Sequence, residues 1–368
     1  MKITKGLIII CAVSSLLLMS CKKDKEIIES VIESFNSEPV IEEDRLILHT
    51  DIQRAYLNDK VENVNLYVRG VEELSRPLSP TFSFEGEGNV FTIHLSEKED
   101  YSNPFIYSVN ECKVTFTNLK IDTTYYYKVI NGEQIIKEDT FTTSDEIIRN
   151  LYVSGVTNVR DLGGYRIGET KTKQGIIYRT GKLNKDGVSE VTNLINEKGI
   201  KTMLNDFKVK SEIDLRGVSN NEVGGLSEGT GVLGETVKYY QCPMNFSDSL
   251  DTEENLSAIR KVFSILGDKT NYPTFFHCSI GTDRTGYLAF LINAYLGVEE
   301  ENLYRDYLFS NFGNIGGKRT INNIQSKYVN DIKGYSGETL KDKVQNYLLQ
   351  KGVNQAHLDV LSEMMIEK

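Results

Sequence analysis

The fold of this chain is decided by the stretch His277-Cys278-Ser279-Ile280-Gly281-Thr282-Asp283-Arg284-Thr285-Gly286. An apolar run, Thr274 to Phe276, precedes it, and an apolar run with helical spacing, Tyr287 to Leu296, follows it. This pattern predicts a buried strand, a tight loop and the start of a helix. The first turn of a helix leaves backbone N–H groups free, and the helix dipole adds partial positive charge. We therefore expect a cradle for a tetrahedral oxyanion.

Two side chains of this stretch carry its chemistry. Cys278 lies at the base of the predicted cradle, where the positive field favours thiolate over thiol and makes the sulfur a nucleophile at neutral pH. Arg284 lies six positions later, and its planar guanidinium can hold two oxygens of a phosphate. The predicted phosphate-binding residues are Ser279, Ile280, Gly281, Thr282, Asp283 and Arg284.

The composition is that of an acidic globular protein. The chain has 368 residues, 39% of them hydrophobic, and a formal net charge of −10. This length allows two domains, and the negative charge argues against nucleic acid as a partner.

The first residues predict export. A short basic start is followed by an apolar run, Gly6 to Met19, that is too short for a comfortable membrane span. The run ends at Leu18-Met19-Ser20-Cys21, which resembles the lipobox of bacterial lipoproteins. We expect a signal peptide at 1–20, a lipid on Cys21 that anchors the protein in the bacterial cell envelope, on the periplasmic face or the cell surface, and a linker at 21–44.

The remaining cysteines, Cys112, Cys242 and Cys278, are odd in number and widely spaced, which argues against a disulfide framework. No Cys/His spacing suggests zinc, and we expect no metal and no cofactor. Two interpretations of Cys242 stay open. It is a buried strand-end residue beside Pro243, or it forms a reversible disulfide with Cys278 that protects the nucleophile from over-oxidation.

Residues 45–145 alternate with a period of two and contain no predicted helix, which favours an all-β immunoglobulin-like sandwich. Among the alternating segments are Val64 to Val68 and Val90 to Leu95. A hairpin is predicted where Tyr125 to Ile130 meets Asn131-Gly132. The last strands, Val114 to Thr143, resemble those of a fibronectin type III domain. Such a domain would be a recognition module, or a spacer that positions or shields the catalytic domain.

Residues 146–368 alternate between helices and strands, which predicts an α/β domain with a central, mostly parallel sheet and flanking helices. The key loop would lie at the carboxyl end of a central strand, where ligands bind in such folds. Strands are predicted at Ile176–Arg179, Ile200–Met203, Ser211–Arg216, Val237–Tyr240 and Phe275–Phe276. Helices are predicted at Val188–Glu197, Asn255–Leu266, Tyr287–Leu296, Glu300–Ser310, Ile321–Ile332, Leu340–Gln350 and Asn354–Ile366.

The signature His277 to Gly286 resembles the protein tyrosine phosphatase superfamily, and is similar to the loop of the mycobacterial and listerial secreted enzymes. The segment Asn158 to Tyr165 resembles their Asn-Phe-Arg-Asp-Leu-Gly-Gly motif. Gly175 to Leu183 and Ile213 to Arg216 resemble their next two strands. The resemblance runs from about Tyr152 to the C-terminus, in order. It implies a phosphotyrosine phosphatase-like fold.

The resemblance also implies a mechanism. Cys278 attacks phosphorus to form a phosphocysteine, while the amides from Ser279 to Arg284 and the Arg284 side chain hold the phosphoryl oxygens. Gly281 lets the loop turn close to the phosphate, and Thr285 can donate its hydroxyl to the departing sulfur. His277, Arg160 and Asp161 are expected to support the loop.

The general acid is less defined. Asp283, inside the signature, is the first candidate, and Asp214 is the second unless it forms an ion pair with Arg216 or Arg179. The weaker candidates are Asp161, which also suits a turn, Asp248 and Asp251.

The resemblance has one departure, because Thr282 replaces a lysine that many relatives carry and that is associated with turnover of phosphoinositides. Loss of that charge lowers the expectation for polyanionic headgroups. The predicted function is an exported, lipid-anchored tyrosine phosphatase acting on a phosphoprotein or a small phosphoester. The alternatives are an inositol polyphosphate or phosphoinositide phosphatase and a non-catalytic phosphate-binding lipoprotein. A rhodanese-like sulfurtransferase is disfavoured by the Cys-to-Arg spacing and the following Thr-Gly.

Overall fold

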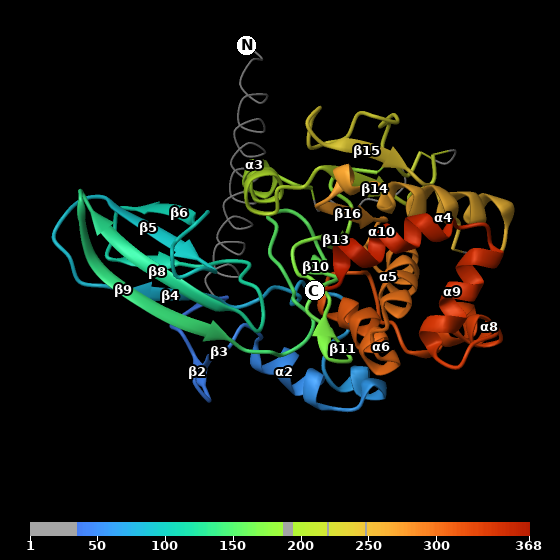
Figure 1. Ribbon diagram of the computed structural model, residues 1–368, viewed down its shortest axis with the longest axis horizontal. Helices are drawn as coiled ribbons and strands as arrows, with labels where there is room; N and C mark the ends of the chain where they lie inside the picture. The colour runs from blue at the N-terminus through green and yellow to red at the C-terminus, as the bar shows by residue number, and fades with distance from the viewer. Residues whose placement is uncertain (1–34, 187–193, 219–220, 247–248) are drawn as a thin grey trace, which may run out of the picture. The chain divides into compact units, whose positions relative to one another are not determined.

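The computed structural model describes residues 35–186, 194–218, 221–246 and 249–368 (Figure 1). The predicted signal peptide and the lipidation site Cys21 lie outside the described residues, and so does most of the helix predicted from Val188. Within the described ranges, no helix combines the length and the apolar character needed to cross a bilayer. The contacts divide the chain into two compact units.

The first unit is built from strands and contains Leu78–Thr117 and Thr124–Thr142, together with described residues up to Leu48. One sheet has the order β2-β3-β9-β8-β5-β6, and a smaller one has the order β1-β4-β7. The strands are β1 Asn36–Ser37, β2 Ile41–Glu42, β3 Arg45–Leu46, β4 Ser79–Ser83, β5 Phe91–Ser96, β6 Phe105–Val109, β7 Lys113–Thr115, β8 Thr124–Asn131 and β9 Gln134–Thr143.

The predicted hairpin of this unit is confirmed. Asn131 pairs with Gln134 across the turn, and Gly132 adopts a φ of 60°, which the turn requires and which glycine adopts without strain. Alternate side chains of β5 and β8, such as Ile93 and Tyr127, are buried. These side chains form the core together with aromatic rings of the smaller sheet, such as Phe82 of β4, whose ring packs on Tyr127. The resemblance to fibronectin type III stays a prediction.

The expectation of strands alone over 45–145 is wrong. A helix, α2 (Asp51–Asn58), and a 3-10 segment, η1 (Val61–Leu66), follow β3 and replace the strand expected at Val64 to Val68. The start of α2 is stabilised because the Gln53 side chain accepts from the Thr50 N–H at 3.1 Å. Residues 49–77 belong by their contacts to the second unit, where the buried Tyr56 ring packs on Phe309 and Phe312.

The second unit contains the α/β domain. Its main sheet has the order β10-β13-β16-β14-β15. β13, β16, β14 and β15 are parallel, and β10 is antiparallel to β13. The strands are β10 Arg160–Asp161, β13 Ile177–Thr180, β14 Ser211–Asp214, β15 Lys238–Gln241 and β16 Thr274–His277, and β11 Arg166–Ile167 pairs separately with β12 Thr170–Lys171. The predicted central, mostly parallel sheet is therefore confirmed, with β16 in its middle.

The second unit also contains helices predicted from the sequence. One of them, α5 (Asp283–Leu296), is buried from Thr285 to Leu296, which explains its continuous apolar sequence. α5 contacts α6 (Glu300–Phe309) and α9 (Leu340–Gln350), and α4 (Glu253–Leu266) contacts α10 (Gln355–Met365) (Figure 1). The remaining helical segments are η3 Lys269–Asn271, η4 Ser310–Phe312, α7 Asn322–Ile324, η5 Gln325–Val329 and α8 Asn330–Lys333.

One predicted strand of this unit is wrong. Ile200 to Met203 is helical, in α3 (Glu197–Lys201) and the π-helical η2 (Thr202–Asp206). The Asn196 side chain caps α3 by accepting from the Gly199 N–H at 3.1 Å. The cap starts a helix that the β-branched residues then continue.

Candidate active site

The signature loop joins the central strand to the most buried helix. β16 ends at His277 and α5 begins at Asp283, so residues 278–282 lie at the carboxyl ends of the parallel strands. Gly281 has a φ of 69°, and a Cβ there would lie 2.4 Å from the Thr180 carbonyl oxygen at the end of β13. Only glycine fits this turn against its neighbouring strand.

Two side chains hold the loop carbonyls outward. The Asn158 amide donates to the carbonyl oxygens of Ile280 at 3.1 Å and Gly281 at 2.9 Å, and the Arg179 guanidinium donates to Gly281 at 2.8 Å. In a trans peptide the N–H points opposite to the carbonyl. The N–H groups that follow these carbonyls therefore face the other side of the loop, as an oxyanion cradle requires.

Beneath the loop lies a buried cluster of two arginines and one aspartate. Arg160 donates to Asp306 at 3.0 Å and to the hydroxyl of Ser310 at 3.1 Å, and Arg179 pairs with the other oxygen of Asp306. Both guanidinium groups are fully buried. Arg160 also donates to the Asn158 side chain, so the predicted supporting role of Arg160 is explained by its links to the residues that hold the loop.

Cys278 is 2% exposed at the base of the loop. Burial raises the pKa of its thiol, but the charge of Arg284 and hydrogen bonds from the side chain and amide of Thr285 outweigh burial, and the net pKa lies below the ordinary value. Thr285 is fully buried in the first turn of α5, next to the cysteine loop, and its side chain contributes to the lowered pKa.

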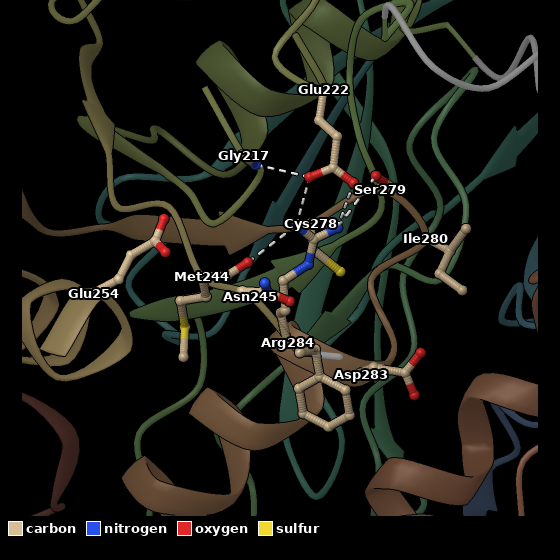
Figure 2. A pocket seen from close by; sticks show the side chains of 11 residues that line it. Gly217, Glu222, Met244, Asn245, Glu254, Cys278, Ser279, Ile280, Asp283 and Arg284 are labelled. Carbon is tan, nitrogen blue, oxygen red and sulfur yellow. Dashed lines mark hydrogen bonds and ion pairs between the residues drawn. The ribbon is translucent and has the colours of Figure 1, made fainter. Parts of the chain in front are cut away.

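Arg284 is held by a carboxylate that the sequence did not single out. Glu222 accepts from its two terminal nitrogens at 2.6 and 3.1 Å and also accepts from the Gly217 N–H at 2.7 Å. Figure 2 shows the Glu222 carboxylate facing the Arg284 guanidinium beside Cys278. The pKa of Glu222 is lowered, since Arg284 and the Gly217 N–H outweigh burial. The pairing therefore fixes an ionised carboxylate and the direction of the phosphate-binding guanidinium.

A cavity of about 670 Å³ opens over Cys278. Its apolar lining comes from Met244, Phe246 and Ile280, and among the described lining residues Arg284 is the one cation. The full lining is Gly217, Glu222, Met244, Asn245, Phe246, Glu254, Cys278, Ser279, Ile280, Asp283 and Arg284. Figure 2 shows Glu254 and Asp283 on opposite sides of Arg284.

Asp283 lines the cavity with both carboxylate oxygens engaged. Arg319 donates to them at 3.0 and 2.9 Å, and the Tyr307 hydroxyl donates to one at 3.0 Å. Tyr307 packs closely on α5, because a Cβ at Gly286 would lie 2.7 Å from its ring.

The expectation that Asp214 serves as a general acid is corrected by its surroundings. It is fully buried, and accepts from the Arg216 side chain at 2.6 to 3.1 Å and the Tyr239 hydroxyl at 2.7 Å. Burial raises its pKa, but His277 and Arg216 outweigh that effect and lower it to about 2. A carboxylate that is ionised and sealed from the cavity cannot deliver a proton. Asp214 and the buried His277, which contacts Glu212 at 3.0 Å, support the strand beneath Cys278.

The other predicted acids also have structural partners or fall outside the described residues. Asp161 is buried and accepts from Arg149 at 2.6 Å and from the N–H groups of Gly163 and Gly175, which makes it a loop organiser. Asp251 pairs with Lys351 at 2.7 Å and does not line this cavity. Asp248 lies outside the described residues.

The disulfide between Cys242 and Cys278 is excluded by the sheet. Asp214 of β14 lies opposite both His277 of β16 and Gln241 of β15, so the two cysteines follow strands separated by a third. Two strand spacings amount to roughly 10 Å, whereas a disulfide needs Cα atoms within about 7 Å. Burial raises the pKa of Cys242 to about 12, as suits an inert core thiol. The described cysteines are free, and the described part of the chain holds no cluster of three or more His, Cys, Asp or Glu suited to a metal.

Comparisons with known proteins bear on this loop. Residues 151–367 match the sequence model described as "Tyrosine phosphatase family". No curated protein matches the chain. Among solved structures, it is similar to the core catalytic domain of PP-IP phosphatase SIW14 from S. cerevisiae in complex with citrate, at 18% identity and a TM-score of 0.28 over 44% of this chain and 88% of that one. A second structure of the Siw14 catalytic core shows 16% identity and a TM-score of 0.28, over 47% and 86% of the two chains.

The TM-scores are too low to carry an argument about substrate. The sequence match covers more than half of the chain and includes every residue of the cradle. The chain therefore belongs to the tyrosine phosphatase family and is a phosphomonoester hydrolase of that type.

Proposed function

We propose that this protein hydrolyses aryl phosphomonoesters, with phosphotyrosine as the representative substrate, through a phosphocysteine intermediate. The observation that carries the proposal is Cys278, which has a lowered pKa and shares one cavity with Arg284. A thiolate at the base of an amide-lined loop is positioned to attack phosphorus in line with the leaving oxygen.

The chemistry needs two steps. In the first, the Cys278 sulfur forms a bond to phosphorus while the bond to the substrate oxygen breaks, and the amides of 279–284 with Arg284 hold the three equatorial oxygens. In the second, water attacks phosphorus and gives a proton to the carboxylate that protonated the leaving oxygen, while the bond between sulfur and phosphorus breaks and the thiolate leaves. The Thr285 hydroxyl, buried at the start of α5, would stabilise that thiolate by donating a hydrogen bond to it.

The cavity lining supports a substrate with one phosphate on an apolar group. Met244, Phe246 and Ile280 offer contact to a ring, and Arg284, which serves the first phosphate, is the one cation among the described lining residues. Additional phosphates on the substrate would find no second cation in this lining and no lysine at position 282. This charge pattern disfavours inositol polyphosphates and phosphoinositides.

The leaving oxygen needs a proton from a carboxyl group. Glu222 is paired with Arg284, which lowers its pKa, and both carboxylate oxygens of Asp283 already accept hydrogen bonds from Arg319. Glu254, in the first turn of α4, lines the cavity and has no hydrogen bond or ion pair with the described residues. We propose that the proton donor is Glu254 or Asp248. Asp248 follows the lining residue Phe246 by two positions in the sequence and lies outside the described residues.

The proposal includes export and a lipid anchor on Cys21, supported by the basic start, the apolar run and the lipobox-like sequence before it. The substrate would then be a phosphoprotein or a small phosphoester in the cell envelope. For the β unit, we propose the role of a spacer that positions or shields the catalytic domain.

A substrate panel tests the proposal. The chain lacking residues 1–21 is assayed on a phosphotyrosine peptide, inositol hexakisphosphate and phosphoinositide vesicles, with Cys278→Ser as control. We expect phosphate release from the peptide, loss of that release in Cys278→Ser and little release from the polyanions. Preference for the inositol phosphates would contradict the substrate class, and full activity of Cys278→Ser would contradict the mechanism.

A further inference from the structure

The phosphate site contains a carboxylate whose charge opposes its ligand. Asp283 is the first residue of α5 and lines the cavity above Cys278. A phosphate bound in the loop carries up to two negative charges, and an uncompensated carboxylate beside it would repel it. The loop itself offers no cation to offset Asp283, since residue 282 is a neutral, buried threonine and Arg284 is paired with Glu222.

The compensating charge comes from a distant part of the chain. Arg319 lies in the loop between η4 and α7 and donates to both oxygens of Asp283, at 3.0 and 2.9 Å. A two-pronged pairing of this kind fixes the direction of both side chains as well as neutralising the carboxylate. The pKa of Arg319 is raised by its hydrogen bonds to Asp283, so the guanidinium stays charged.

Arg319 is also held in place by its own backbone. Its N–H donates to the side-chain oxygen of Asn311 at 2.7 Å, and the Asn311 amide donates to the Arg319 carbonyl at 3.1 Å. Asn311 is 1% exposed and is the middle residue of η4, the short helical segment that follows α6. Arg319 is therefore anchored to η4, which directly follows the helix α6 that carries Tyr307, the third donor to Asp283.

We propose that Arg319 is a positioning residue for phosphate binding, which neutralises Asp283 and so lets the signature loop accept an oxyanion. It acts through Asp283, because Arg319 is not among the residues lining the cavity. The proposal rests on the proposed role of the loop as a phosphate cradle. It predicts that the loss of Arg319 is harmful only while Asp283 carries its charge.

A double-mutant cycle on tungstate binding tests this coupling without requiring turnover. Calorimetric affinity for tungstate is measured for the chain lacking residues 1–21, for Arg319→Met, for Asp283→Asn and for the double variant. We expect Arg319→Met to weaken binding about tenfold, and Asp283→Asn in the same chain to restore it to within about threefold of the parent. Lys333→Met is the matched control, since it removes an exposed cation paired with Glu300 and should leave the affinity unchanged.

A double variant that binds as weakly as Arg319→Met, or an Arg319→Met variant that binds like the parent, would overturn the proposal. Thermal unfolding of each variant reports folding. If Arg319→Met does not fold, Arg319→Lys serves instead. We expect its affinity for tungstate to lie between those of the parent and Arg319→Met, and adding Asp283→Asn should restore it toward the parent value. Failure of the phosphatase function itself would appear separately, as activity retained by Cys278→Ser.

Discussion

Replacing Glu222 should change two measurable quantities, kcat/KM and the pKa of Cys278, and should lower both. It holds Arg284 through two hydrogen bonds, at 2.6 and 3.1 Å, with both side chains largely buried. Glu222→Gln removes the negative charge from this ion pair. A hydrogen bond between charged groups contributes roughly 1.5–3 kcal/mol, so misdirection of Arg284 should lower kcat/KM about 10- to 100-fold. The same change leaves the charge of Arg284 less compensated, which should lower the pKa of Cys278 further.

Both readouts are measurable on one protein. The rate of iodoacetamide alkylation against pH gives the pKa of Cys278, and initial rates on a phosphotyrosine peptide give kcat/KM. Glu228→Gln is the matched control, because Glu228 pairs with Lys261 on the surface and should change neither value. A Glu222→Gln variant with unchanged kcat/KM, or with a raised pKa of Cys278, would refute the account of Arg284 as a guanidinium directed by Glu222.

Three further predictions follow from the buried and lining groups. Asp214→Asn should destabilise the fold by about 3–5 kcal/mol in urea unfolding, since it breaks a buried ion pair. Because the pKa of Asp214 is lowered to about 2 in the folded state, its contribution is present above its ordinary value near 4 and is lost as pH falls toward 2. If Glu254 is the proton donor, Glu254→Gln should lower the hydrolysis rate of aryl phosphates with a high leaving-group pKa by about 100-fold or more, and that of aryl phosphates with a low leaving-group pKa much less. Asp283→Asn should lower the rate equally for both kinds of substrate. A rate loss in Asp283→Asn that depends on the leaving group would indicate that Asp283 is the acid. Thr285→Val should raise the pKa of Cys278 in the alkylation assay, and an unchanged midpoint would remove Thr285 from the site.

The strand–loop–helix unit around Cys278 could be predicted because its signals are local. An apolar strand, a loop with one required glycine and an apolar helix follow one another within about twenty residues, and their geometry depends on backbone rules that act over that range. The hairpin at Asn131-Gly132 was predictable for the same reason. The strand predicted at Ile200 was wrong. The β-branched residues there favour a strand, but in the structure the Asn196 cap starts a helix that includes them.

The rest of the site depends on contacts between residues far apart in sequence. Glu222 meets Arg284 across 62 positions and Arg319 meets Asp283 across 36, and neither has a pattern that marks it as a partner. Asp214 was predicted as a possible acid because sequence shows the residue type but not burial. The segment 49–77 was assigned to the β unit because nothing in its own sequence reveals that Tyr56 packs on Phe309 and Phe312.

The most direct test of the central claim is to locate the phosphoryl group during turnover. The chain lacking residues 1–21 is mixed with a phosphotyrosine peptide, quenched within milliseconds and digested, and the peptides are mapped by mass spectrometry. We expect one phosphoryl group on Cys278 of the parent protein. The Cys278→Ser variant should carry no phosphoryl group and release no phosphate. A phosphoryl group on another residue, or steady turnover by Cys278→Ser, would contradict it.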